Sequence, residues 1–553
     1  MNKIERCAKV FSAESLRDFF MGRIYPIVVA LIVLVGYFTG LEFYLHLVNM
    51  ALICAALLVC DSIRPLIMPL CSFVFQISMQ NSPSDLNNGV PSNYYFEEGR
   101  LPVLVISFVA VFVALVYFFI KNKLISGRSL RSLPYLIPTA VLAVALMLGG
   151  IGSGEWTVDE LGFALVQIVS WFLIFYLFVL GLKNENAKDI TRYVVYISSL
   201  IAMILIAEVL EIYLTTENMM NGEGTIDRHL LRYGWGICNT AAQAVGVLVP
   251  VLFIGAIKGE KPLYRIYYFT IATFAFVASI MNASRTALLT GAPIYIACLV
   301  VYVIKSKHKI RNMIEILAVI AALVACLMPV RESIALLIDN YTLRGINDSG
   351  RYVIWEYAIK MFSENKIFGL GTIAHAKISP YTSTHAEFLP FMVHNTPIQL
   401  LVGYGVVGFG AYIFYRASTV IPFFRKPKLE KSMLGLALLS VLVGSLLDNF
   451  LFYIMPMFYF SVCLATVEKH VEEEKSAIVT ASVADDSASP AECVDSVECS
   501  CGEELSDVQC SDDVQSEEDA EEVCTEEKNR EKEEHVECVV DLVGEEIKAE
   551  ENI

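Results

Sequence analysis

The sequence predicts an all-α protein: a polytopic bundle of about 12 to 14 transmembrane helices, with a large, partly helical outer loop and a disordered acidic C-terminal tail. Three observations predict this architecture. Of the 553 residues, 56% are apolar. Apolar runs, most of them long enough to cross a bilayer, follow one another as far as residue 467. Beyond that residue the composition becomes strongly acidic.

Fourteen apolar runs are candidate spans. They lie near 24–39, 44–60, 65–80, 101–120, 134–152, 161–181, 193–213, 235–257, 266–281, 286–304, 312–330, 396–415, 433–447 and 450–467. They divide the chain into an amphipathic cytoplasmic segment at 1–23, eleven spans within 24–330, a large extracytoplasmic loop at 331–395, three spans within 396–467 and the tail at 468–553.

The net charge of −17 is unevenly divided along the chain. Residues 468–553 hold 30 acidic and 6 basic residues, so the tail carries −24 and the rest of the chain +7. The tail has few aromatic residues and no sustained periodicity, so it cannot bury enough apolar surface to offset its chain entropy. We expect it to be disordered, and nothing in it names a partner.

Lysine and arginine indicate the orientation in the membrane, because they accumulate in cytoplasmic loops. With the N-terminus inside, the inner loops hold 25 of these residues and the outer segments 10, so both termini are predicted to be cytoplasmic. No cleavable signal peptide is evident, and the first span is expected to remain as an anchor. The bilayer is therefore a predicted partner, whereas nucleic acid is not.

A histidine and an asparagine, His394 and Asn395, stand directly before the uncharged run at 396–415. Thr396 as N-cap, Pro397 at the first helical position and Gln399 at the third form a capping box, which predicts a helix start at Pro397. The positive end of that helix disfavours a second cation, so a neutral imidazole is expected, able to act as a general base. An exposed interfacial histidine is the equally weighted alternative.

Four arginines are placed on the outer side: Arg228, Arg232, Arg285 and Arg351. Arg285 is the only charge between Ile266 and Ile304, and we expect it to hold an anion rather than reach for water. Singly, the others fit solvated surface charges. Together they supply guanidinium forks that match the oxygens of a diphosphate.

The outer loop is expected to contain a helix over "SGRYVIWEYAIKMF", with Ser349 as cap and Tyr352, Trp355, Ile359 and Phe362 on one face. The stretch Gly403 to Gly408 reads G-x-G-x-x-G but lies inside a predicted span, so we expect close helix packing and no dinucleotide site. The spacings of His375, His385 and His394 fit no zinc pattern, and neither a metal nor a cofactor is predicted.

These residues resemble a known family. His394-Asn395, then nine residues, then Gly405-Val406-Val407-Gly408 is similar to the signature of the O-antigen ligase and O-antigen polymerase superfamily. "SRTALL" and "SGRYVIWEYA" resemble its Ser-Arg and Ser-Gly-Arg segments, in the same order, within roughly 228–410. The run of candidate spans exceeds the family's usual twelve, and the acidic tail has no counterpart.

The resemblance implies a metal-independent, inverting glycosyltransferase on the outer face of the bacterial cytoplasmic membrane. Its donor would be a glycan on an undecaprenyl-diphosphate carrier, and its acceptor a hydroxyl of a lipid or a growing polysaccharide. By this carry-over His394 is the base, Asn395 lies in the substrate site, and Arg285 and Arg351 hold the diphosphate. Arg228 and Arg232 are assigned to the same role from their side and charge.

A flippase or transporter for lipid-linked oligosaccharide is the alternative, since such proteins have a similar number of spans. A transporter needs ionisable groups around a cavity near the bilayer midplane. Here the candidate groups gather at the outer edge, beside a long loop, which favours the transferase.

Overall fold

The computed structural model describes residues 12–77, 99–126, 131–154, 156–216, 226, 238–259, 261–305, 309–344, 351–371, 393–424, 428–452 and 454–487. Apart from a single bridge residue, Ile226, the regular secondary structure of these residues is helical, which confirms the predicted all-α bundle. Arg228, Arg232, His375, His385 and Ser349, named above, lie outside the described residues.

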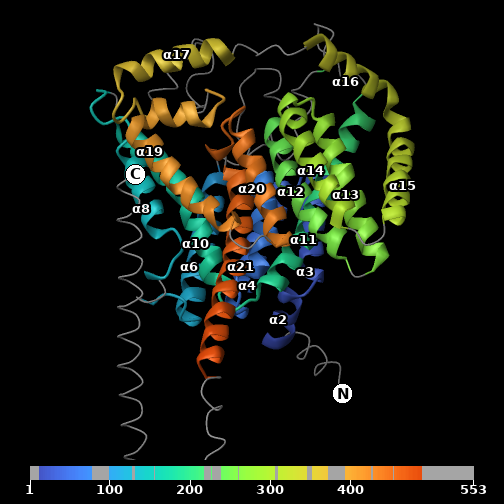
Figure 1. The fold of residues 1–553 in the computed structure, drawn as a ribbon, viewed down its shortest axis with the longest axis horizontal. Helices are drawn as coiled ribbons and strands as arrows, with labels where there is room; N and C mark the ends of the chain where they lie inside the picture. The colour runs from blue at the N-terminus through green and yellow to red at the C-terminus, as the bar shows by residue number, and fades with distance from the viewer. Residues whose placement is uncertain are drawn as a thin grey trace, which may run out of the picture. The chain divides into compact units, whose positions relative to one another are not determined.

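The helices follow one another along the chain as Figure 1 shows. They are α2 Ala13–Met21, α3 Ile24–Thr39, α4 Glu42–Val59, η1 Arg64–Leu66, α5 Ile67–Ile77, α6 Arg100–Lys121, α8 Leu136–Met147, α9 Val158–Ile168, η4 Val169–Leu173, α10 Ile174–Gly181, α11 Ala187–Thr215, α12 Cys238–Lys258, α13 Pro262–Met281, η5 Ala287–Gly291, α14 Ala292–Lys305, α15 Lys309–Leu327, η6 Met328–Val330, α16 Arg331–Arg344, α17 Arg351–Glu364, α19 Thr396–Phe424, α20 Leu429–Gly444, η7 Phe450–Phe452 and α21 Ile454–Ser487.

Each of the fourteen expected spans coincides with a helix, and eight helices in the described chain are long and apolar enough to cross a membrane. They are α4, α6, α9 to α10, α11, α13, η5 to α14, α15 to α16, and α19. A ninth span arises if the bent pair α2 and α3 is counted as one. The other predicted runs coincide with α3, α5, α8, α12, α20 and α21, which are shorter, continue into polar sequence or adjoin residues outside the described ones.

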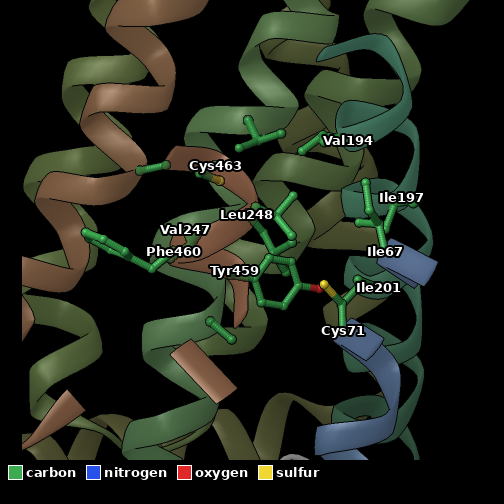
Figure 2. Packing of buried hydrophobic residues seen from close by; sticks show 14 of the residues in the cluster. Ile67, Cys71, Val194, Ile197, Ile201, Val247, Leu248, Tyr459, Phe460 and Cys463 are labelled. Atoms are coloured by element: carbon green, nitrogen blue, oxygen red, sulfur yellow. The ribbon is translucent and has the colours of Figure 1, made fainter. Parts of the chain in front are cut away.

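The core lies where α12 contacts α11, α13, α14 and α20. Figure 2 shows a neighbouring part of it, where the ring of Tyr459 points toward Cys71, with Leu248 and Ile201 close by. The rim has the opposite character: Ile106 and Ile120 of α6 are 68% and 70% exposed. In water such a surface would be costly, whereas lipid covers it without penalty.

The two ends of the bundle differ in the elements that they carry. In Figure 1, α17 lies across one end, here called the α17 end, and α2 lies at the opposite or α2 end together with the last turns of α21. At the α2 end α21 continues as a helix to Ser487, and Lys469 and His470 are buried. The expected start of the acidic tail at 468 therefore lies inside this helix, because side chains of α11 and α20 pair with it.

The predicted outer-loop helix is present as α17. Its buried face carries Ile354 and Ala358, with Trp355 packed beside them. Tyr352 and Ile359, expected on that face, are 69% and 52% exposed. The helix is therefore rotated relative to the predicted stripe, since the small Ala358 allows it to lie close to the start of α19.

Candidate functional site

The start of α19 differs by one residue from the expected cap. Asn395 is the capping residue, since its side-chain oxygen accepts a hydrogen bond from the backbone N–H of Ile398 at 3.0 Å. Thr396 is already helical, and its hydroxyl instead donates to the carbonyl of Asp448 at 3.3 Å. The prediction of Thr396 as cap is wrong because a tertiary partner takes its hydroxyl.

His394 is held in an unusual backbone conformation. Its φ is +52°, in the left-handed region that few residues other than glycine adopt. On its N-terminal side, the indole N–H of Trp355 donates to the carbonyl of Val393 at 2.7 Å. On its C-terminal side, the side-chain Nδ2 of Asn395 donates to the carbonyl of Leu446 at 2.9 Å. Contacts on both sides therefore fix the direction in which the imidazole leaves the chain.

A buried carboxylate stands directly behind the imidazole. His394 Nδ1 lies 3.0 Å from Asp448 Oδ1, and the side chains are 37% and 2% exposed respectively. The backbone N–H of Asn449 also donates to Asp448 Oδ1, at 2.8 Å. An ionised carboxylate only accepts, so Nδ1 carries the proton and Nε2 presents its lone pair when the ring is neutral.

The ionisation of Asp448 follows from its surroundings in the turn between α20 and η7. Burial by itself raises the pKa of this carboxyl. The hydrogen bond from His394, the charge of that ring, the N–H of Asn449 and the charge of Arg351 together outweigh burial, so the pKa of Asp448 lies below its ordinary range. The carboxylate is therefore charged at neutral pH.

Two more side chains extend the pair of His394 and Asp448 toward the break between α13 and η5. Asn239, in the first turn of α12, donates from Nδ2 to Asp448 Oδ2 at 2.8 Å. Ser284 Oγ donates to Asn239 Oδ1 at 2.7 Å. His394 is thus connected through three consecutive hydrogen bonds to the residue that immediately precedes Arg285.

The helix that begins at Arg285 is capped and braced. Ser284 Oγ accepts from the backbone N–H of Ala287 at 3.3 Å, while Ala283 before it has a φ of +51°. The hydroxyl of Tyr341 in α16 donates to the carbonyl of Ile280 at 2.9 Å. A half-buried Arg285 therefore stands at a helix N-terminus, where anions are stabilised.

Arg351, the first residue of α17, reaches the same turn from the other side. Its guanidinium donates to the carbonyl of Leu447, and its charge acts on Asp448. Within the described residues it makes no ion pair, and its remaining N–H groups keep their capacity to donate. The structure therefore brings His394, Asn395, Arg351 and the start of the Arg285 helix to one locality.

The Gly403 to Gly408 stretch breaks α19, and it also lies close to Gly149 at the end of α8. Gly405 has φ +65° and ψ −165°, which breaks the helix, and Figure 1 shows α19 as two pieces meeting at an angle. The segment after α17 fills the gap: the N–H of Leu370 donates to the carbonyl of Val402 at 2.8 Å, and the N–H of Val406 to the carbonyl of Lys366 at 2.9 Å. The loop that carries Arg351 is thereby tied to the helix that carries His394.

Sequence reasoning missed Asp448, Asn239 and the role of the Ser284 hydroxyl. Asp448 had a usable signal, since it is the only charged residue between Lys431 and Glu468. Asn239 had none, because a lone asparagine at a helix start is ordinary. In the part of the chain that the structure describes, no group of three or more His, Cys, Asp or Glu side chains is arranged to hold a metal ion.

In a comparison with known families, residues 268–413 match the family described as O-antigen ligase. The match runs from α13 into α19 and includes Arg285, Arg351 and His394, but it leaves Asn239 and Asp448 outside. It confirms the resemblance to the O-antigen ligase and polymerase superfamily: this multi-pass membrane protein carries an O-antigen ligase domain and functions in polysaccharide biosynthesis. A comparison with curated proteins gives no match.

Proposed function

Because the chain carries an O-antigen ligase domain, we propose that it transfers a glycan from an undecaprenyl-diphosphate carrier to an acceptor hydroxyl at the α17 end, on the outer face of a bacterial cytoplasmic membrane. The acceptor is a lipid or a growing polysaccharide. The observation that carries the proposal is the pairing of a partly exposed imidazole, His394, with a buried carboxylate, Asp448, beside arginines that suit a diphosphate.

His394 is the general base of this reaction. Nε2 takes the proton of the acceptor hydroxyl while Nδ1 keeps its bond to Asp448. The carboxylate behind the ring stabilises the imidazolium that forms, and it fixes the tautomer that leaves Nε2 free. Asn395, one residue along, caps the helix and so sets the position of the ring.

The bonds change as follows. The deprotonating acceptor oxygen attacks the anomeric carbon of the donor, and the bond from that carbon to the phosphate oxygen breaks with its electron pair. The carrier diphosphate leaves as an anion, and the proton on His394 passes to water after the product departs. Attack from the face opposite the leaving group inverts the anomeric centre, and no metal is assigned a role.

Arg285 and Arg351 are proposed to hold the diphosphate. As the bond breaks, negative charge grows on the phosphate oxygen that was joined to the anomeric carbon. Hydrogen-bond donors fixed near this oxygen therefore stabilise the transition state more than the bound substrate. Arginine suits this task because its planar fork matches two phosphate oxygens at once. Arg228 and Arg232 are proposed to contribute from the segment between α11 and α12.

The test uses membrane vesicles from a strain that lacks the chromosomal copy and carries one variant. These vesicles contain both the carrier-linked glycan and its acceptor. A glycosyl diphosphate is acid-labile whereas the product glycoside is not, so the initial rate of appearance of acid-stable glycan measures transfer. His394→Ala is expected to lower this rate by about 10²- to 10⁴-fold, the usual contribution of a general base.

His470→Gln is the matched control. This second histidine is 7% exposed and contacts Thr191 at the α2 end, so its loss is expected to leave the transfer rate unchanged. A wild-type rate in the His394→Ala vesicles, at equal protein levels, contradicts the proposed function. The alternative of a flippase makes a different forecast, namely that carrier-linked units accumulate on the inner face when the protein is absent.

A further inference from the structure

Two polar side chains link the base to the arginine helix, and one of them, Asn239, lies outside the family match. Asn239 comes from α12 and Ser284 from the break after α13, and the hydrogen bonds that connect them to Asp448 measure 2.7 and 2.8 Å. Nothing in the proposed chemistry so far requires them. They nevertheless form a hydrogen-bonded chain behind Asp448, where apolar side chains could fill the same space.

The direction of every hydrogen bond in this chain is fixed by chemistry. Asp448 Oδ2 only accepts, so the NH₂ group of Asn239 must face it. The amide oxygen of Asn239 then faces Ser284, whose hydroxyl must donate. Ser284 Oγ remains able to accept from the backbone N–H of Ala287 at 3.3 Å. Turning the amide around would break the bond to Asp448 and set two acceptor oxygens against each other.

We propose that Asn239 and Ser284 are positioning residues for glycan transfer: the Asn239 amide holds Asp448 aligned behind His394, and Ser284 joins that alignment to the helix start that presents Arg285. The inference rests on the proposed function. Its consequence is that the base and the diphosphate site are held in register by one hydrogen-bond chain.

This role predicts a pH signature that a purely structural role lacks. In the Asn239→Asp variant, a protonated carboxyl at 239 donates to Asp448 as the amide does. Once ionised it cannot donate, and it places a like charge against Asp448. Neighbouring carboxylates of this kind share a proton up to unusually high pH, so the change falls within the working range.

The measurement is the vesicle assay described above, run from about pH 5 to about pH 8. The ratio of the Asn239→Asp rate to the wild-type rate is expected to fall by about tenfold or more as the pH rises, since each pH unit above the pKa reduces the protonated fraction tenfold. Taking the ratio to wild type at each pH isolates the effect of the substitution. Protein levels and thermal unfolding at both pH limits confirm equal folding.

Serine variants test the other link. Ser284→Ala frees the Asn239 oxygen and is expected to lower kcat by about tenfold. Ser284→Thr keeps a hydroxyl that can both donate and cap, so it is expected to stay near the wild-type rate. Ser279→Ala is the matched control, because among the described residues that buried hydroxyl bonds only to the carbonyl of Phe276 in its own helix.

A pH-independent Asn239→Asp ratio, in vesicles where wild type is active and His394→Ala is not, overturns this inference and leaves the proposed function in place. A Ser284→Ala rate equal to that of Ser279→Ala has the same meaning, and it decides the matter alone if the Asn239→Asp protein fails to insert. Wild-type vesicles that form no acid-stable glycan overturn the proposed function itself.

Discussion

The two ends of the bundle treat charge in opposite ways. At the α2 end, basic groups meet carboxylates: Arg64 lies 2.9 Å from Glu185, and the fully buried Lys431 lies 3.1 Å from Glu474. At the α17 end, Asp448 is buried and accepts neutral and histidine donors, while Arg351 donates to a carbonyl.

Under the proposed function, this difference separates an end with a structural role from an end that carries the chemistry. At the α2 end, the charge pair of Lys431 and Glu474 joins α20 to the last turns of α21, and the backbone N–H of Ala187 in α11 donates to Glu473 of the same turns. Under the proposed function, the carboxylate at the α17 end orients a histidine, and the Arg351 guanidinium donates to an anion. The contrast predicts that substitutions at the α17 end change transfer, whereas those at the α2 end change stability.

The largest effect is expected from Asp448→Asn. The amide presents either a donor or an acceptor to His394, so the required tautomer is no longer enforced and transfer should fall by roughly 10²- to 10⁴-fold. The measurement is the rate of acid-stable glycan formation at pH 7. A rate within threefold of wild type (about 0.7 kcal/mol) would show that the Asp448 carboxylate is not needed for transfer.

Asp448→Asn is also expected to change the pH dependence of stability at the α17 end. The pKa of Asp448 is lowered in the folded protein, so its contribution is present above about pH 4 and is lost as pH falls through the folded value. Wild type should therefore unfold at a higher temperature than Asp448→Asn at pH 7, and the gap should close on acidification below about pH 4. A gap that widens on acidification would contradict the direction of this pKa shift.

A smaller effect, mainly on stability, is expected from Gly405→Ala. A Cβ at this position would overlap the carbonyl oxygen of Ile367, and the φ of +65° is unfavourable for alanine. We expect a loss of about 2–4 kcal/mol in unfolding free energy, with reduced transfer because the break positions the helix of His394. Gly410→Ala is the control, since nothing lies within 4 Å of its Cβ; equal effects of the two would show that the break is unimportant.

The smallest effect is expected from Glu474→Gln at the α2 end. It leaves Lys431, 0% exposed, without its charged partner, so unfolding should become easier by about 1–3 kcal/mol. Transfer per folded molecule should be unchanged, because this pair lies at the opposite end from His394. A selective loss of transfer without loss of stability would break the proposed division between the two ends.

Much of the fold was predictable because long apolar runs in a membrane protein have few alternatives to helix. The positions of all fourteen runs coincide with helices. Continuity along each run was not predictable, since composition does not reveal where a backbone opens. The break at Gly405 depends on the segment around Ile367, which supplies the hydrogen bonds that the opened turn lacks.

In the candidate site, too, some features were predictable from the sequence and others were not. His394, Arg285 and Arg351 were recognisable because charged or titratable residues are rare beside uncharged runs, and the family match includes all three. Arg228 and Arg232 stay predictions. The cap at Asn395 in place of Thr396 was not predictable, because the carbonyl that draws away the threonine hydroxyl comes from a turn 52 residues later in the chain.

The sequence by itself determined that this chain is a bundle of apolar helices with an uncharged helix starting beside a histidine, because hydrophobicity and capping chemistry act over a few turns. Only the tertiary structure decided which carboxylate stands behind that histidine, and which amide and hydroxyl stand behind the carboxylate. Such partners arrive from α12, α13 and α20 through packing, and hydrogen bonds between distant segments leave no periodic trace in the order of residues.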